Sequence, residues 1–192
     1  MRILQILSGT ELNGAVGYAL NISELLTERG HEIILLRRPQ LDRSVPSIGN
    51  IKRIDSTLKR SSSEIRRIGA FCSEQKIDVI HTHMSSAHAF GALLRLFYKV
   101  PCVATAHKLN FQLHWALNDR VLCHNDESMR YMRRFNLVPA SRLRLVRPFI
   151  DEREVQNSRE PREATLSRFG LPTDRPVMIT VGNFISRKGL ID

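Results

Sequence analysis

The chain has 192 residues and a formal net charge of +10. Its 42 % of hydrophobic and 6 % of aromatic residues are ordinary for a soluble α/β protein, and no apolar run approaches the roughly 18 residues that cross a bilayer. The odd number of cysteines (Cys72, Cys102 and Cys123) argues against a disulfide framework and favours reduced thiols, which points to the cytoplasm.

Short apolar runs alternate along the chain with helical patterns, which is typical of a parallel sheet covered on both faces. The first run begins at Arg2, so we expect no signal peptide. The predicted fold class is α/β, with a Rossmann-like, doubly wound and mainly parallel sheet. Its predicted strands are Arg2–Leu7, His31–Leu36, Ile51–Ile54, Asp78–Thr82, Pro101–Ala106, Arg120–Cys123 and Leu143–Val146.

Four helices are predicted between these strands. In the first, one apolar stripe (Ala15, Ala19, Ile22 and Leu26) repeats at helical spacing, and Gly30 follows where a left-handed cap is expected. The others are predicted at Ser62–Gln75, at Ser85–Tyr98 with Phe90, Leu93, Leu94 and Phe97 facing inward, and at Asp126–Phe135 after the N-cap residue Asn125.

The composition changes after about residue 149, where prolines and charged residues become frequent. We therefore predict a Rossmann-like domain over residues 1–155, followed over 156–192 by a linker and the start of a second, truncated Rossmann-like domain. The strand Val177–Val181 would open that second domain, and Ser186–Gly189 would begin its first helix.

Positive charge is concentrated in two stretches. Lys52–Arg67 holds six basic residues against two acidic ones, and Arg130–Arg147 holds six arginines and no acid. Such surfaces attract phosphorylated ligands, anionic lipid headgroups or nucleic acid, and charge alone does not choose among them. Charge that only keeps the protein in solution is the simpler alternative.

A glycine loop follows the first strand and opens the first helix. There Gly14 would let a phosphate approach the free N–H groups of the helix start, although a simple turn glycine is the common alternative. The spacing of Gly9, Gly14 and Gly17 is not that of a dinucleotide fingerprint. Because arginines (Arg37 and Arg38) stand where an acidic ribose ligand would be expected, NAD binding is disfavoured.

Histidines gather near the ends of predicted strands. His81 and His83 share one face of a strand, and His88 lies nearby, but no carboxylate or cysteine spacing supports a metal site. His107 follows the strand that ends at Ala106, at the edge where ligands bind in open α/β sheets. Its plainer interpretation is a loop histidine hydrogen-bonded to backbone.

Five segments together resemble family 4 retaining glycosyltransferases of the GT-B fold, in that family's order and spacing. They are Arg29–Glu32, Asp78–His83, Thr105–His107, Leu143–Asp151 and Val181–Gly189. The resemblance covers nearly the whole chain and implies an acceptor-side N-terminal domain and a donor-side C-terminal domain. It implies transfer of a sugar from a nucleoside-diphosphate sugar with retention of configuration.

The resemblance also implies roles for particular residues. His107 would be the catalytic residue beside the reacting sugar, and the candidate substrate-binding residues are Asn13, Gly14, His83, Arg187 and Lys188. Gly14 would touch the donor phosphates, and Lys188 would hold the diphosphate. No metal and no cofactor would be required, since fixed cations and N–H groups stabilise the departing nucleoside diphosphate.

Two positions depart from the family pattern. Asn183 stands where an arginine is usual, and Pro148–Phe149 replaces an Asn-Gly turn. These departures favour one rival, a non-catalytic acceptor- or lipid-binding module of the same fold. A second rival, a basic nucleic-acid-binding domain, has only charge in its support.

The expected partners are a nucleotide sugar, a carbohydrate or lipid-linked acceptor and an anionic membrane surface, but no nucleic acid. The protein would be cytoplasmic and peripheral to the membrane. We expect Lys52–Arg67 to bind anionic membranes weakly, and we expect these 192 residues alone not to turn over a nucleotide sugar.

Overall fold

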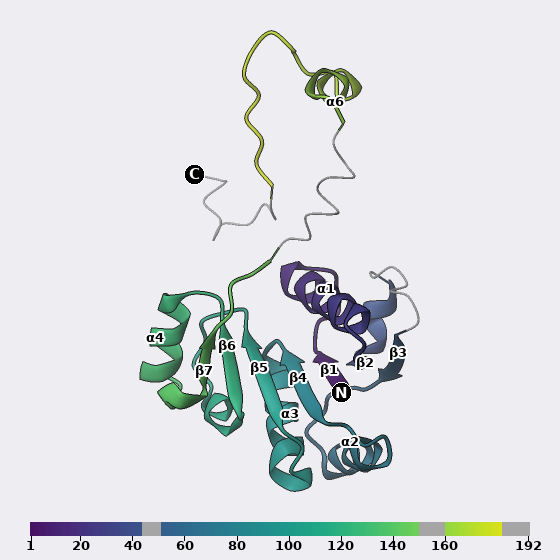
Figure 1. The fold of residues 1–192 in the computed structure, drawn as a ribbon, viewed down its shortest axis with the longest axis vertical. Coiled ribbons are helices and arrows are strands. Elements are labelled where there is room, and N and C mark those ends of the chain that lie inside the picture. The colour runs from purple at the N-terminus through teal and green to yellow at the C-terminus, as the bar shows by residue number, and fades with distance from the viewer. Residues whose placement is uncertain (44–50, 150–159, 182–192) are drawn as a thin grey trace. The chain divides into compact units, whose positions relative to one another are not determined.

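The computed structural model describes residues 1–43, 51–149 and 160–181 (Figure 1). The chain divides into two compact units, Met1–Pro148 and Phe149–Asp192. The expected domain boundary after residue 155 lies outside the described residues.

The first unit is built on one sheet of seven parallel strands in the order β3-β2-β1-β4-β5-β6-β7 (Figure 1). The order reverses between β1 and β4, as in doubly wound folds. This confirms the predicted fold class and all seven strands. No observed strand end differs from the predicted one by more than one residue. The strands are β1 Arg2–Leu7, β2 Glu32–Arg37, β3 Lys52–Asp55, β4 Val79–His83, β5 Cys102–Ala106, β6 Arg120–Cys123 and β7 Leu143–Leu145.

Four α-helices connect these strands, and the structure adds three short 3₁₀ helices that the sequence did not predict. The α-helices are α1 Gly14–Glu28, α2 Ser62–Glu74, α3 Ser85–Tyr98 and α4 Asp126–Arg134. The 3₁₀ helices are η1 Pro39–Arg43, η2 Leu113–Leu117 and η3 Ala140–Arg142.

Two predicted helix ends are confirmed. Gly30 has a φ of +81° after α1, a backbone conformation in which a side chain would be strained. Asn125 caps α4, because its side chain accepts a hydrogen bond from the N–H of Ser128 while the Ser128 hydroxyl lies by the Asn125 N–H.

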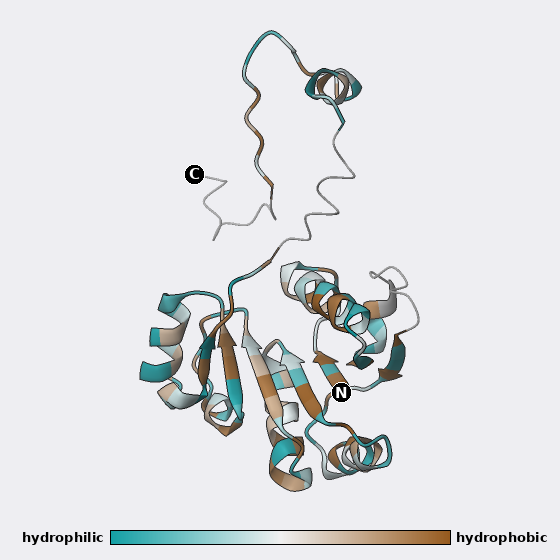
Figure 2. Ribbon diagram, in the orientation of Figure 1, coloured by the Kyte–Doolittle hydropathy of each residue, from teal (hydrophilic) through white to brown (hydrophobic). Residues whose placement is uncertain are grey.

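Alternate residues of the central strands enter different cores. Leu4 and Ile34 pack with Phe90 of α3, whereas Leu7 and Leu35 pack with Val16 of α1. Because successive side chains of a strand point to opposite faces, α1 covers one face of the sheet and α3 covers the other. Figure 2 shows the apolar residues concentrated in the strands, whereas α4 is mostly hydrophilic.

A separate core lies beneath α4 and η2, where Trp115 and Met132 pack with Val121 and Leu143. Trp115 is only 1 % exposed although it lies on a five-residue 3₁₀ helix. It holds in place the segment that connects β5 to β6.

Two predictions about helix faces are corrected. Phe97 was expected to face inward, but it is 64 % exposed. It shares a face of α3 with the buried Phe90 and Leu94, but it lies in the last turn of the helix, one residue before the helix ends at Tyr98. In α1 the buried line runs through Val16, Ala19, Leu20 and Ser23. Of the predicted stripe, only Ala19 is fully buried, so the helix is turned by about one residue.

The second unit differs from the prediction. Val177–Val181 forms no strand, and Met178 is 96 % exposed and Val181 92 % exposed. A strand exists through hydrogen bonds to a neighbouring strand, and residues 160–181 contain no such neighbour. The described residues of this unit form one short helix, α6 Arg162–Arg168, in a segment predicted to be a linker.

Candidate functional site

Four histidines lie at or near the carboxyl edge of the sheet. His83 ends β4, His107 follows β5, and His124 follows β6, while His81 lies two residues earlier in β4. Because these three strands are parallel neighbours, their carboxyl ends come together at one edge. The order of the strands therefore assembles residues that are far apart in the sequence.

Three of these histidines form one hydrogen-bonded chain, which we call the histidine relay (Gln5, His83, His107, His124 and the Val146 carbonyl). His83 Nε2 lies 2.9 Å from Gln5 Oε1, and His83 Nδ1 lies 3.1 Å from His107 Nε2. His107 Nδ1 lies 3.3 Å from His124 Nε2, and His124 Nδ1 lies 3.0 Å from the Val146 carbonyl. Both ring nitrogens of His107 are thus engaged within the chain.

The number of protons in the relay determines its charge. The Val146 carbonyl can only accept, so His124 donates from Nδ1. If Gln5 also accepts, through Oε1, the four hydrogen bonds need four ring protons, one more than three neutral imidazoles carry. If the amide NH₂ of Gln5 instead points to His83, three protons suffice and every ring is neutral.

The surroundings favour the neutral relay. Burial, followed by the nearby histidines, lowers the pKa of His83 well below its usual range. Burial, followed by the charge of His124, lowers the pKa of His107 to about 4. In the neutral relay each ring donates from Nδ1, and the Gln5 amide nitrogen gains a hydrogen-bond partner.

Tyr18 connects the histidine relay to α1. Its ring lies 5.3 Å from the ring of His107 and 5.1 Å from that of His124, in edge-on contacts. Gly14 lies four residues before Tyr18, on the same side of the helix. The start of α1 and His107 therefore lie at the same edge of the sheet, although Gly14 does not line the small cavity beside His107.

The loop before α1 offers fewer free donors than the sequence suggested. Asn13, a predicted substrate-binding residue, is the N-cap, and its Oδ1 accepts from the N–H groups of Ala15 and Val16 at 3.0 and 3.2 Å. A Cβ atom at Gly14 would meet nothing within 4 Å, so the backbone there is open to solvent.

The remaining buried histidines have partners inside the fold. His81 Nε2 lies 2.7 Å from the Thr105 hydroxyl, and His88 Nδ1 lies 2.8 Å from the Thr82 hydroxyl. His88 also packs against Trp115, with 4.2 Å between the ring centres. No group of three or more His, Cys, Asp or Glu side chains suited to a metal ion occurs among the residues that the structure describes.

Two cavities open near this edge. A cavity of about 110 Å³ lies beside His107, between β5 and the start of α4, and includes His124 and Asn125. A larger one, of about 410 Å³, lies between the loop after β3, the start of α3 and the segment before β6. The other two predicted site residues, Arg187 and Lys188, lie outside the described residues.

Sequence reasoning missed Gln5, Tyr18 and His124 as members of the site. His124 had a usable signal, because it follows β6 as His107 follows β5. Gln5 and Tyr18 had none, since Gln5 lies within the apolar run of β1 and Tyr18 is one of several polar residues in α1.

The sequence profile of Glycosyltransferase Family 4 matches residues 12–154, which is most of the chain. The chain belongs to this family. The matched segment includes His83, His107 and His124 of the histidine relay, and it ends shortly after β7. No curated protein is similar enough in sequence to match significantly.

Solved structures of similar fold are GT-B glycosyltransferases. Sucrose-phosphate synthase from Thermosynechococcus elongatus has a TM-score of 0.77 and 17 % identity, over 98 % of this chain and 57 % of its own. A glycosyltransferase from Rickettsia africae has a TM-score of 0.72 and 13 % identity, over 91 % and 51 %. HepE from Anabaena, in complex with UDP-glucose, has a TM-score of 0.68 and 13 % identity, over 88 % and 50 %.

The chain thus spans about half the length of these structures, and at this identity the likeness shows the fold alone. No helix among the described residues is long and apolar enough to cross a membrane.

Proposed function

We propose that this chain is the acceptor-side part of a glycosyltransferase that moves a sugar from a nucleoside-diphosphate sugar to an acceptor with retention of configuration. The observation that carries the proposal is the family match over residues 12–154, which includes the buried histidine relay at the carboxyl edge of the sheet. HepE, a protein of similar fold, has been seen with UDP-glucose, and this supports a nucleotide sugar as the donor class.

His107 is the proposed catalytic residue, beside the reacting sugar. In the neutral relay, His83 Nδ1–H donates to His107 Nε2 and His107 Nδ1–H donates to His124, so the ring orientation of His107 is held from both sides. His83 is fully buried, and we therefore assign it the positioning of His107. A ring held in place needs no reorganisation when charge develops in the transition state.

The donor diphosphate would lie at the start of α1. The helix dipole and the open backbone at Gly14 favour a negative group there, and Asn13 keeps the first turn in shape. Lys188 remains the proposed diphosphate ligand from the second unit, and Arg187 remains a proposed substrate-binding residue. The reaction would use no metal and no cofactor, because N–H groups and cations can stabilise the leaving diphosphate.

The proposed domain organisation keeps residues 1–155 on the acceptor side and 156–192 as the link into a donor-binding domain. The proposed location is the cytoplasm, with peripheral binding to anionic membranes. The net charge of +10 supports the membrane part of this proposal, since each basic residue near an anionic surface contributes about 1 kcal/mol.

Release of nucleoside diphosphate tests this assignment. The purified chain, incubated with a panel of nucleotide sugars, is expected to release none above the blank, because positioning a donor against an acceptor needs both sides of the cleft. Release that disappears in His107→Ala would show that these 192 residues are a complete catalyst. Complete absence of nucleotide-sugar binding would instead favour the non-catalytic module.

A further inference from the structure

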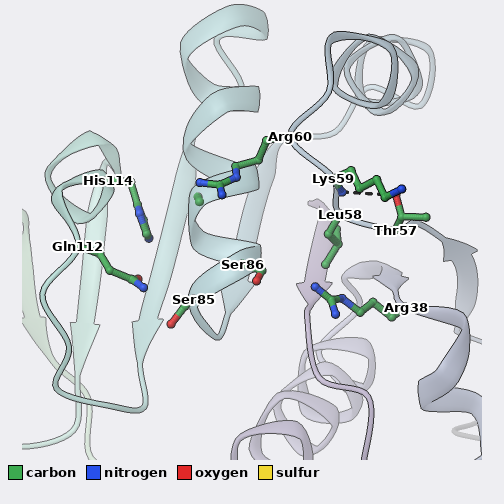
Figure 3. A pocket seen from close by; sticks show the side chains of 10 residues that line it. Arg38, Thr57, Leu58, Lys59, Arg60, Ser85, Ser86, Gln112 and His114 are labelled. Atoms are coloured by element: carbon green, nitrogen blue, oxygen red, sulfur yellow. Dashed lines mark hydrogen bonds between the residues drawn. The ribbon is translucent and has the colours of Figure 1, made fainter.

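The larger of these two cavities, of about 410 Å³, is lined mostly by basic and polar side chains, together with Leu58 and Ala89, and by no carboxylate. Figure 3 shows Arg38 and Arg60 extending toward α3, where Ser85 and Ser86 stand at the helix start. Gln112 and His114 face the same space from the segment on the other side (Figure 3). We call this space the basic cavity.

The positive charge of the basic cavity is uncompensated. Among the described residues no carboxylate pairs with Arg38, Lys59 or Arg60, because the neighbouring acids already have partners. Asp55 pairs with Arg37, and Glu64 pairs with Arg67. The charge of Arg60, after the larger effect of burial, lowers the pKa of His114, so its field reaches across the cavity.

Hydrogen-bonding groups in the basic cavity lack partners. Arg38 Nε, Gln112 Oε1 and His114 Nε2 are buried and make no hydrogen bond within the described part of the chain. Buried polar atoms are rarely left in this way, so these atoms indicate a polar ligand. The 14-residue helix α3 also begins there without a side-chain cap, which leaves its first N–H groups for an anion.

An apolar rim borders the basic cavity. Along the segment that supplies Gln112 and His114, the alternate residues Phe111 and Leu113 turn outward and are 64 % and 60 % exposed. A basic recess beside exposed apolar side chains matches an amphipathic ligand with an anionic head, since the rim can enter the acyl boundary while the recess holds the head.

We propose that the basic cavity binds a phosphate group of the acceptor, carried on a membrane lipid. Two guanidinium groups and the start of α3 suit the several oxygens of a phosphate better than the two of a carboxylate. The identity of the ligand as the acceptor rests on the proposed transferase function. Binding itself needs no donor, so failure of this proposal is distinguishable from failure of the transferase assignment.

The test compares vesicles of phosphatidylcholine mixed with phosphatidic acid and with oleic acid at equal surface charge. We expect co-sedimentation to be at least about fivefold stronger with phosphatidic acid. Arg38→Gln and Arg60→Gln should each weaken binding to these vesicles by roughly tenfold. The matched control is Arg29→Gln, which removes the same charge from an exposed position at the end of α1, outside the cavity and outside both basic stretches, and should change binding less than about twofold.

A soluble arm separates the two sources of phosphate. Glycerol 3-phosphate should shift the amide resonances of Ser85 and Ser86, and Arg60→Gln should abolish the shift. Phe111→Ser should weaken vesicle binding several-fold and leave binding of glycerol 3-phosphate unchanged, whereas the equally exposed Phe97→Ser should affect neither measurement.

A response to glycerol 3-phosphate with no effect of Phe111→Ser on vesicle binding would overturn the lipid source. Equal losses in Arg29→Gln and Arg60→Gln, or equal binding of oleic acid vesicles, would overturn the phosphate site.

Discussion

Replacing Phe90 by alanine is expected to lower the free energy of unfolding by about 3–5 kcal/mol. The ring is fully buried between α3 and the sheet, in the core that also holds Leu4, Ile34 and Ile80. Its removal loses the transfer free energy of a large apolar group and leaves a cavity that the close-packed strands cannot fill. Urea unfolding at neutral pH measures this loss.

Phe97→Ala is the matched control, with the same substitution on the same helix. Its ring is 64 % exposed, and we expect a change of less than about 0.5 kcal/mol. Similar losses in the two variants would mean that the ring of Phe97 is buried as fully as that of Phe90.

Lowering the pH from 7 to 5 is expected to destabilise the fold through its buried histidines. The pKa values of His81 and His107 fall to about 4, in both cases mainly through burial. Below about pH 6.5 these histidines therefore bind protons in the unfolded chain but stay neutral in the folded chain. The free energy of unfolding falls with the pH until the pH reaches the pKa of the folded state. Because the pKa of each histidine is near 6.5 in the unfolded chain and near 4 in the folded chain, each of them lowers the free energy of unfolding by on the order of 2 kcal/mol between pH 7 and pH 5.

The pH dependence of urea unfolding measures this cost. His81→Gln and His107→Gln should each remove the contribution of one histidine to the dependence of the free energy of unfolding on pH. This holds even if the substitution also changes stability at pH 7. The carboxyl groups of Glu64 and Asp119 do not interfere, because arginine partners lower their pKa values and their stabilisation is lost only at more acidic pH. A slope that neither variant changes would show that folding does not lower the pKa values of these two rings.

The sheet was predictable because each central strand is a short apolar run that must be buried on both faces. Its details depended on neighbouring strands. β4 extends to His83 because β1 and β5 pair with it to that point. Val177–Val181 has an equally apolar sequence, yet it forms no strand in the described residues, because a strand needs a partner that local sequence does not specify.

The site was predictable where a residue follows a strand, as His107 does. The histidine relay was not, because it depends on the lateral order β1-β4-β5-β6, which places Gln5, His83, His107 and His124 in one row. The basic cavity was also hidden. Six basic residues in Lys52–Arg67 suggested one charged surface, but Lys59 and Arg60 line the cavity, whereas Arg67 pairs with Glu64.

Titration of the chain with UDP-glucose, followed through its amide and imidazole resonances, tests most directly whether this edge of the sheet is the donor-facing side of a glycosyltransferase. We expect shifts at Gly14 and at His107, and a loss of affinity of at least about threefold in Gly14→Ala, because a methyl group would stand where the phosphate approaches. Gly17→Ala, where a Cβ atom also meets nothing, should leave binding unchanged. Shifts confined to other parts of the chain, or equal losses in the two glycine variants, would contradict the account.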